Sequence, residues 1–350
     1  MKKEIYLTLA DGSVWRGEGE LDEPVEGEVV FTTAACGYPQ TLSDPSCCGQ
    51  IFVFAFPPVG IYGVDTESLE SRKVWLSAAL VSNLDETENG RFKTLSSWMA
   101  ENGKPLINRV DTRQLILKIR ELGSIMGRLD FEPSIPLMKE LPHDMVSNVS
   151  CKEIEVTGQG KISIGVIDYG VKENIIRSIV GRGYRVVRFP NSTKAEDILS
   201  SGIDGIILSN GPGDPSVLDL EISEIRKILG KKPVLGICLG NQLLAITCGA
   251  VTHKLKYGHR GANQPVMDIG SGRGILTSQN HQYVVTEGSL KGTGLEVSFR
   301  HLGDGTIEGL VHRGLDASSV QFHPEASPGP EDAGYIFDDF LSRVTKSGEK

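Results

Sequence analysis

The sequence predicts an α/β protein: a C-terminal, mostly parallel, doubly wound sheet preceded by a smaller, β-rich α+β domain. From Lys161 onward, short apolar runs alternate with amphipathic segments of helical period. Residues 1–150 instead hold apolar runs of strand length and few helical segments. Residues 133–161 combine prolines and glycines with weak periodicity, which is typical of a boundary. We therefore expect domains at residues 1–150 and 161–350.

The first domain is expected to begin with a hairpin at residues 6–17, because Asp11-Gly12 is a turn dipeptide between two apolar segments. Asp111 is a candidate helix N-cap, with Gln114 three residues later and Gly123 as the stop signal. The remaining apolar runs predict strands at residues 28–33, 50–56 and 74–81.

The second domain is expected to alternate strands and helices. Thr193 and Glu196 have the spacing of a capping box for a short helix, and a last helix is expected near residues 332–344. The other predicted strands are residues 162–167, 184–189, 205–209 and 233–237, and the other predicted helices are residues 171–182, 217–229 and 239–247. In such sheets reactive groups gather at the carboxyl ends of the parallel strands.

Length and composition exclude several classes of function. The chain has 350 residues, which favours about two domains. It carries 36 Lys and Arg against 45 Asp and Glu, a net charge of −9, and no basic run, so we expect no nucleic-acid partner. The longest strongly apolar run, residues 51–56, is too short for a membrane span, and the N-terminal apolar run is too short for a signal peptide. We therefore expect a cytoplasmic protein with no membrane partner.

The six cysteines form no C-x-x-C pair and no zinc-finger spacing, so we expect free thiols and no metal site. Cys238 differs from the others because it lies between a predicted strand and a predicted helix, with Gly236 and Gly240 on either side. This pattern is typical of a nucleophile elbow with Cys in place of Ser. The turn places the thiol at a helix N-terminus and aims the Leu239 amide at an oxyanion. The alternative, a buried structural cysteine, suits Cys248 better.

A base for this thiol is predicted at His323, where a strand ends at a proline. In an extended chain His323 and Glu325 project to the same side, roughly 6.5–7 Å apart along the backbone. One imidazole nitrogen can then meet the carboxylate while the other faces the thiol, which is the logic of a catalytic triad. Taken alone, the segment is equally well a surface His-Pro-Glu turn.

The third element is the loop at residues 210–215, which follows a predicted strand and contains Gly211-Pro212-Gly213. Its backbone amides are not covered by side chains, so the loop can supply a second oxyanion donor. In isolation, an ordinary strand-to-helix turn is the simpler interpretation.

Together the three elements resemble the class I (triad) glutamine amidotransferases, and within that group the small, glutaminase subunits of carbamoyl-phosphate synthetases. The resemblance covers essentially the whole chain. Its motifs in the second half are residues 208–215 (LSNGPGDP), 236–240 (GICLG), 279–281 (QNH) and 323–330 (HPEASPGP). In the first half, residues 31–34 (FTTA), 37–38 (GY) and 44–46 (DPS) resemble the family's N-terminal domain, which amidotransferases of anthranilate or GMP synthesis lack.

The resemblance implies a role for each matching residue. Cys238 is the expected nucleophile, His323 the general base and acid, and Glu325 the residue that orients His323. The amides of Gly211 and Leu239 form the expected oxyanion hole, and Lys172 matches a lysine near the site. The residues expected to hold L-glutamine are Ser46, Gly211, Gly213, Leu239, Gln242, Asn280, Gln282 and Tyr283.

Three positions depart from the family pattern. Asn241 and Gln264 stand where many relatives carry His, and Gln282 stands where many carry Gly. None belongs to the triad, so they bear on the affinity for glutamine more than on the reaction.

The resemblance implies that Cys238 forms a thioester with glutamine, that glutamate is released, and that ammonia passes to a large subunit of a heterodimer. That subunit would bind ATP and Mg²⁺ and make carbamoyl phosphate from bicarbonate for arginine and pyrimidine biosynthesis. No cofactor is expected on this chain, which has no complete P-loop or dinucleotide-binding motif. Three alternatives stay open: a stand-alone Cys-His-Glu γ-glutamyl hydrolase, the glutaminase of another amidotransferase, and a non-catalytic docking subunit.

Overall fold

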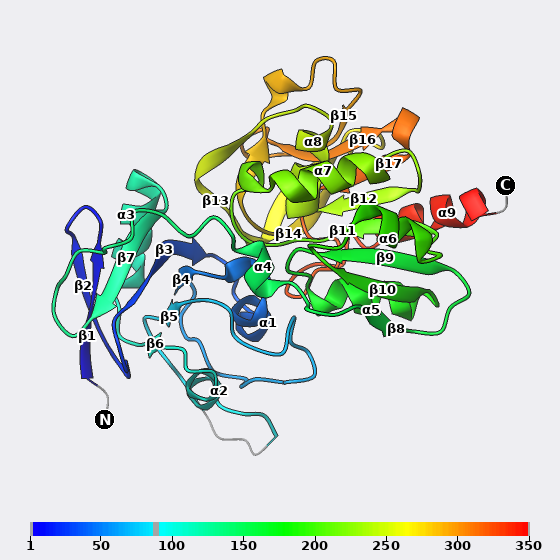
Figure 1. Cartoon of the computed structure of the whole chain (residues 1–350). Helices are drawn as coiled ribbons and strands as arrows, with labels where there is room; N and C mark the ends of the chain where they lie inside the picture. The colour runs from blue at the N-terminus through cyan, green and yellow to red at the C-terminus, as the bar shows by residue number, and fades with distance from the viewer. Residues whose placement is uncertain (1–2, 87–90, 349–350) are drawn as a thin grey trace. The chain divides into compact units, whose positions relative to one another are not determined.

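The structure is a computed structural model that describes residues 3–86 and 91–348 (Figure 1). Contacts between Cα atoms divide the chain into two compact units. The first unit comprises Met1–Pro142 and Lys256–Gly261, and the second comprises His143–Leu255 and Ala262–Lys350.

The segment Lys256–Gly261 belongs to the first unit although it is distant in sequence. The amide of Ser124 donates to the Lys256 carbonyl at 2.8 Å, and the amide of Thr33 donates to the Arg260 carbonyl at 3.5 Å. No sequence pattern predicted that residues 256–261 would pack with the first unit. The expected domains, residues 1–150 and 161–350, stay a prediction, because compactness does not test whether either part folds alone.

The first unit is built on a seven-stranded sheet in the order β2-β1-β7-β3-β4-β5-β6. Antiparallel pairs join β2, β1, β7 and β3, and parallel pairs join β3, β4, β5 and β6. The expected hairpin is present as β1 and β2. The strands are β1 (Lys3–Leu9), β2 (Val14–Gly19), β3 (Val25–Thr32), β4 (Gln50–Phe54), β5 (Ala78–Leu80), β6 (Leu106–Ile107) and β7 (Ile125–Asp130).

Helix α3 (Thr112–Leu122) forms where the sequence predicts it. The Asp111 carboxylate accepts a hydrogen bond from the Gln114 amide at 3.0 Å, which satisfies one of the free amides at the helix start. Leu115 and Ile119 pack on the sheet, so α3 buries one apolar face. The unit also contains α1 (Tyr38–Ser43), η1 (Pro45–Cys47) and α2 (Leu95–Glu101).

The second unit is built on a ten-stranded sheet in the order β14-β13-β15-β16-β17-β12-β11-β9-β10-β8. Its centre, from β17 to β10, is parallel, and antiparallel strands extend it on both sides. The strands are β8 (Glu155–Thr157), β9 (Ser163–Asp168), β10 (Arg185–Pro190), β11 (Gly205–Leu208), β12 (Val234–Ile237), β13 (Thr252–Asp268), β14 (Arg273–Val285), β15 (Glu296–His301), β16 (Ile307–His312) and β17 (Ala317–Val320).

Helices cover both faces of the parallel strands (Figure 1). Neighbouring strand residues belong to different apolar clusters, as Ile206 and Ile207 do, because side chains alternate between faces. One cluster contains side chains of α5 (Glu173–Gly181) and α9 (Tyr335–Gly348), and the other contains side chains of α6 (Ala195–Ser200), α7 (Asp219–Ile228) and α8 (Leu239–Thr247). The shorter helices are α4 (Val146–Val149), η2 (Pro215–Val217), η3 (Glu287–Ser289) and η4 (Arg313–Leu315). The expected α/β fold class is confirmed.

Two element predictions were wrong in detail. Strand β5 covers only part of the predicted range 74–81. The predicted capping box at Thr193 does not form: Lys194 is at the N-cap position of α6, and the Glu224 carboxylate of α7 accepts from the Ala195 amide at 2.7 Å. A cap supplied by a neighbouring helix leaves no signal in the local sequence.

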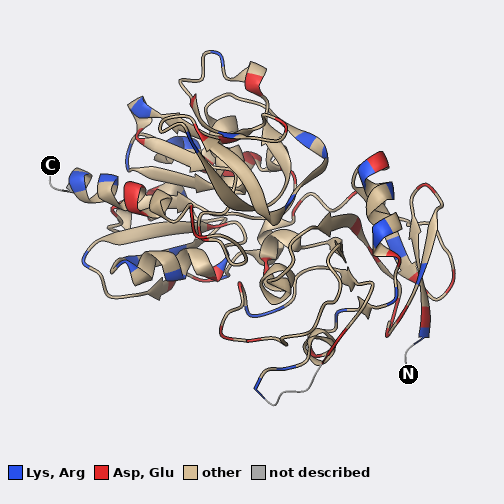
Figure 2. Cartoon of the chain, turned by 180° about the vertical axis from the view of Figure 1, so that it is seen from behind, with Lys and Arg blue, Asp and Glu red and all other residues tan. Residues whose placement is uncertain are grey.

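Charged residues of both signs are mingled along the ribbon of each unit (Figure 2). All six cysteines are free thiols. Within the described ranges, no helix combines the length and apolar character needed to span a membrane.

Candidate functional site

Cys238 lies at the turn between β12 and α8, as the elbow pattern predicts. Its backbone has φ 55° and ψ −101°, a conformation that non-glycine residues rarely adopt. The flanking glycines are required by close packing: a Cβ on Gly236 would lie 2.5 Å from the Gly240 carbonyl oxygen, and one on Gly240 would lie 2.1 Å from the Leu208 carbonyl oxygen. Close packing is therefore the physical reason why glycines stand two residues before and after Cys238.

The Cys238 thiol is almost completely enclosed. The residue is 3% exposed, its amide donates to the Val320 carbonyl at 2.9 Å, and its Sγ atom lies 3.8 Å from the Asn280 carbonyl oxygen. Cys238 precedes the first residue of α8, where amides lack partners within the helix. The thiol therefore lies at a positive helix end in a site that largely excludes water.

His323 and Glu325 follow β17, the strand next to β12, so the sheet brings them to the edge that carries Cys238. His323 Nδ1 lies 2.6 Å from Glu325 Oε1, and both side chains are buried. Since an ionised carboxylate can only accept, Nδ1 carries the proton of this hydrogen bond. Nε2 forms no hydrogen bond of normal geometry with any described residue and is left for a reacting group.

Lys172 adds a buried positive charge to this pair. Its Nζ atom lies 3.0 Å from Glu325 Oε1 and donates to the Ala326 carbonyl at 2.6 Å. The Asn210 side-chain oxygen accepts from the Lys172 amide at 3.1 Å, which fixes the turn before α5. The resemblance implied a lysine near the site at Lys172, and the structure shows that it contacts Glu325 and the Ala326 carbonyl.

The charges of this cluster shift two pKa values in opposite directions. Burial raises the pKa of the Glu325 carboxyl group, but Lys172 and His323 lower it by more, to about 2. Burial lowers the pKa of His323, whereas the negative charge of Glu325 and the Cys238 thiol raise it, to about 10. Glu325 is therefore ionised at neutral pH, and it favours the protonated form of His323.

The two expected oxyanion donors lie together. A Cβ built on Gly211 would lie 2.8 Å from the Leu239 side chain and 2.2 Å from the Tyr169 carbonyl oxygen. The loop from β11 therefore packs directly on the start of α8, and residue 211 has no room for a side chain. This arrangement is compatible with two amides stabilising one oxyanion.

Most of the residues expected to hold glutamine lie in the second unit. Gln242 Nε2 donates to the Tyr283 carbonyl at 2.7 Å, and Gln282 Nε2 donates to the Leu255 carbonyl at 2.8 Å. The Asn280 carbonyl faces the Cys238 thiol, whereas Gly213 is exposed in the loop after β11. Ser46 belongs to the first unit, on η1, where its amide donates to the Asp44 side chain. All these binding roles stay predictions.

Sequence analysis missed a buried polar network beside Cys238. Ser319 Oγ donates to Asn241 Oδ1 at 2.8 Å, and Gln321 Oε1 accepts from Asn241 Nδ2 at 3.0 Å and from Gln242 Nε2 at 3.1 Å. The position of Gln321 in the sequence was a weak indication of its place near the site. It is two residues before His323, so in an extended chain both side chains project to the same side.

Gln264, another departure from the family pattern, is outside this network, and its side-chain oxygen lies 3.1 Å from His301 Nε2.

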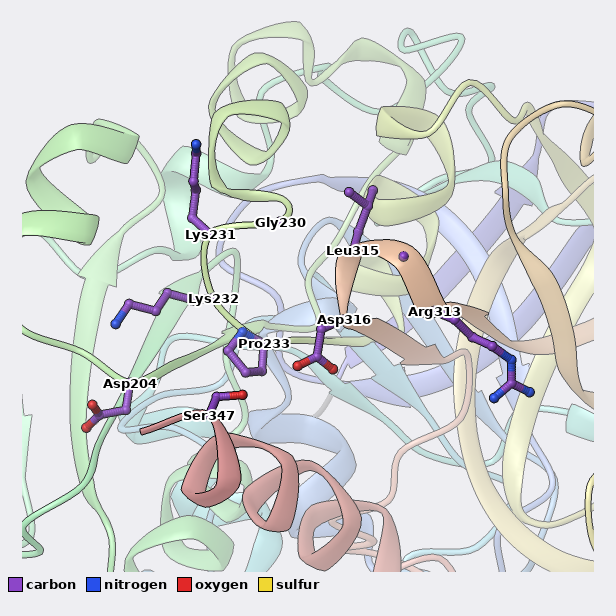
Figure 3. Close-up of a pocket in the computed structure, with 10 residues that line it drawn as sticks. Asp204, Gly230, Lys231, Lys232, Pro233, Arg313, Leu315, Asp316 and Ser347 are labelled. Atoms are coloured by element: carbon purple, nitrogen blue, oxygen red, sulfur yellow. The ribbon is translucent and has the colours of Figure 1, made fainter. Parts of the chain in front are cut away.

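A hollow of about 310 Å³ lies at the opposite edge of the same sheet (Figure 3). Asp204, Pro233 and Asp316 line it, and they directly precede β11, β12 and β17. Cys238 and His323 follow the carboxyl ends of β12 and β17. The hollow is therefore separate from the Cys-His-Glu site.

Comparisons with known proteins match both halves of the chain. Residues 165–343 match the class-I glutamine amidotransferase family, and residues 7–129 match the CPSase domain of the carbamoyl-phosphate synthase small chain. The carbamoyl phosphate synthase small chain of Staphylococcus epidermidis is 44% identical over 362 residues, covering 100% of this chain and 98% of that relative.

Two further relatives carry more specific names. The carbamoyl phosphate synthase arginine-specific small chain of Geobacillus stearothermophilus is 41% identical over 347 residues, covering 98% of each chain. The pyrimidine-specific small chain of Halalkalibacterium halodurans is 44% identical over 352 residues, covering 97% of this chain and 96% of that relative.

The fold of the second unit and its family match define a class-I glutamine amidotransferase. Since the similarity extends over the whole chain, the chain belongs to the carbamoyl phosphate synthase small chain family. The similarity includes the first unit, so neither a stand-alone hydrolase nor the glutaminase of another amidotransferase is favoured.

Proposed function

We propose that this chain is the glutamine-hydrolysing subunit of a carbamoyl-phosphate synthetase. The observation that carries the reaction is the buried group of Cys238, His323, Glu325 and Lys172 at one edge of the sheet. Membership of the small chain family supports L-glutamine as the substrate and a large synthetase subunit as the partner.

In the first half-reaction, the proton of the Cys238 thiol passes to His323 Nε2, and the thiolate Sγ adds to the side-chain carboxamide carbon of glutamine. The amides of Gly211 and Leu239 stabilise the resulting oxyanion. His323 Nε2 donates a proton to the leaving nitrogen, the carbon–nitrogen bond breaks, and ammonia departs. A γ-glutamyl thioester on Cys238 remains.

In the second half-reaction, water adds to the thioester carbon while His323 Nε2 accepts a proton from it. The carbon–sulfur bond then breaks, the thiol recovers its proton, and glutamate leaves. Glu325 holds the Nδ1 proton throughout, so that Nε2 always faces the reacting atoms. No cofactor is needed on this chain for either step.

Ammonia released into bulk water becomes mostly ammonium, which is not nucleophilic. Direct transfer to a second protein therefore suits the chemistry. The partner would be a large subunit that binds ATP and Mg²⁺ and forms carbamoyl phosphate from bicarbonate in a cytoplasmic heterodimer. The product would supply arginine and pyrimidine biosynthesis, to which the names of two relatives correspond.

The test is glutamate release from L-glutamine by the purified chain, with and without the large subunit, bicarbonate and ATP. We expect slow release by the chain alone, and a sharp rise in the complete mixture that equals the carbamoyl phosphate formed. Fast glutamate release at a rate that does not change when the large subunit is added would instead indicate an independent hydrolase.

Cys238→Ser is the matched variant for this experiment. We expect it to lose synthesis from glutamine and to keep synthesis from added ammonium salt, because only the large subunit acts on free ammonia. Normal glutamine-dependent rates in this variant would contradict the assignment of Cys238 as the nucleophile.

A further inference from the structure

The buried network beside Cys238 ends on Gln242, a residue expected to bind glutamine. Gln242 Nε2 donates two hydrogen bonds, to the Tyr283 carbonyl at 2.7 Å and to Gln321 Oε1 at 3.1 Å. Gln321 Oε1 also accepts from Asn241 Nδ2 at 3.0 Å. One side-chain oxygen therefore serves two amide donors.

The orientation of these amides is fixed by their partners. The Tyr283 carbonyl can only accept, so the group that faces it from Gln242 is the NH₂ group. The same NH₂ group faces Gln321, so Gln321 presents its oxygen there. Asn241 then presents its own NH₂ group to that oxygen, and its oxygen accepts from the Ser319 hydroxyl at 2.8 Å.

Gln321 is held in this network by its backbone and by its side-chain oxygen, whereas its Nε2 atom has no hydrogen-bond partner among the described residues. It is completely buried, and its amide donates to the Glu308 carbonyl of β16 at 2.8 Å. Asn241 is also completely buried, and Gln242 is 3% exposed. Since no water competes in such a site, the loss of one acceptor leaves buried donors without partners, which is costly.

The network decides what Gln242 can offer to a ligand. Both protons of its amide are used, by Tyr283 and by Gln321. Its side-chain oxygen receives no hydrogen bond from the described residues. Gln242 can therefore offer a ligand only a hydrogen-bond acceptor. The donor on glutamine that is not consumed by the reaction is its α-ammonium group.

We propose that Gln321, supported by Asn241, is a positioning residue for glutamine binding: it holds Gln242 with its oxygen toward the substrate. The proposal rests on the proposed function, since it concerns recognition of the same glutamine. Asn241 takes part through its side-chain amide, which donates to Gln321 Oε1 at 3.0 Å.

The test is Gln321→Met, which keeps the length of the side chain but cannot accept the two hydrogen bonds. We expect KM for glutamine to rise about 10-fold, because leaving buried donors without an acceptor weakens binding by a free energy that corresponds to about a 10-fold change in affinity. The value of kcat should stay within about 2-fold, because Gln321 does not touch the reacting atoms. Gln321→Glu retains an accepting oxygen and should restore part of the affinity.

Two labelling reactions at Cys238 give a readout that does not depend on turnover. A chloroketone analogue of L-glutamine must occupy the glutamine site, whereas iodoacetamide has no α-ammonium group. In Gln321→Met the chloroketone should label Cys238 about 10-fold more slowly at low concentration, and iodoacetamide should label it at the wild-type rate.

Asn191→Leu is the control, since it also removes a hydrogen-bonded amide, one that donates to Glu221 at 2.9 Å with no link to Gln242. Its KM and both labelling rates should equal the wild-type values. An unchanged KM in Gln321→Met, or a loss confined to kcat, would overturn the proposal. A wild-type chain that hydrolyses no glutamine and does not react with the chloroketone would instead overturn the proposed function.

Discussion

Cys238 occupies a backbone conformation that costs about 1–3 kcal/mol for a residue with a side chain. The surrounding structure holds it there: its amide donates to the Val320 carbonyl, and its carbonyl accepts from the amides of Asn241 and Gln242. In this conformation the thiol faces the Asn280 carbonyl of β14, at 3.8 Å. Cys238, the proposed nucleophile, thus differs from Cys248, which has φ −81° and ψ −2°, in its backbone conformation as well as in its neighbours.

We expect Glu325 to affect catalysis through the one proton that it holds on His323 Nδ1. In Glu325→Gln the side chain keeps its shape but loses the charge that favours protonated His323, and an amide can stabilise the wrong imidazole tautomer. We expect kcat for glutamine hydrolysis to fall on the order of 10²-fold, while the protein stays folded. Steady-state kinetics at saturating glutamine measures this effect.

His323→Asn provides the comparison for that variant and should be the more severe change. If Glu325→Gln were as inactive as His323→Asn, Glu325 would have a more direct part in proton transfer.

At the scale of elements, α8 packs too closely on β11 to accept any side chain at Gly240. A Cβ there would lie 2.1 Å from the Leu208 carbonyl oxygen, a backbone atom that cannot move alone. We expect Gly240→Ala to destabilise the protein by about 2 kcal/mol or more and to displace Cys238. Denaturant unfolding and the rate of iodoacetamide labelling would measure the two effects.

Gly181→Ala is the matched control, since Gly181 is also a helix residue but a Cβ on it meets nothing within 4 Å. Because alanine is the better helix former, this variant should be more stable by about 0.5 kcal/mol. A Gly240→Ala protein as stable as Gly181→Ala would contradict the packing argument.

Helix α8 shows what can be predicted at this scale. Its bounds, Leu239–Thr247, are those expected from the sequence, because the glycine pattern marks its start and an apolar run, residues 243–246, forms its second half. Helix α6 shows the limit. Its first amide, that of Ala195, donates to the Glu224 carboxylate of α7, so the start of α6 depends on a helix that follows it in the chain.

At the scale of the whole molecule, the charged cluster links pH to stability. The pKa of Glu325 falls from 4.5 to about 2. Its contribution to the free energy of unfolding is therefore complete above about pH 4.5 and is lost as the pH falls toward 2. The pKa of His323 rises from 6.5 to about 10. Its contribution to the free energy of unfolding is therefore complete below about pH 6.5 and is lost as the pH rises toward 10. The two windows overlap between pH 4.5 and 6.5.

We therefore expect the stability difference between the wild type and Glu325→Gln to be largest at about pH 5.5 and to shrink steadily toward about pH 9.5. Thermal unfolding at several pH values in this range measures it, and the difference between the two proteins removes the contribution of other titrating groups. A difference that does not change with pH would show that His323 and Glu325 are not coupled.

The sequence by itself determined the fold class, the parallel strands of the second unit, the elbow at Cys238 and the pairing of His323 with Glu325. These features depend on residues close together in the chain: glycines two positions from Cys238, and two side chains on one side of an extended segment. Only the tertiary structure decided the contacts of Lys172, the cap of α6, the place of residues 256–261 and the network from Ser319 to Gln242. Each of these joins groups that are far apart in sequence, and the sheet order that brings them together leaves no mark on any single segment.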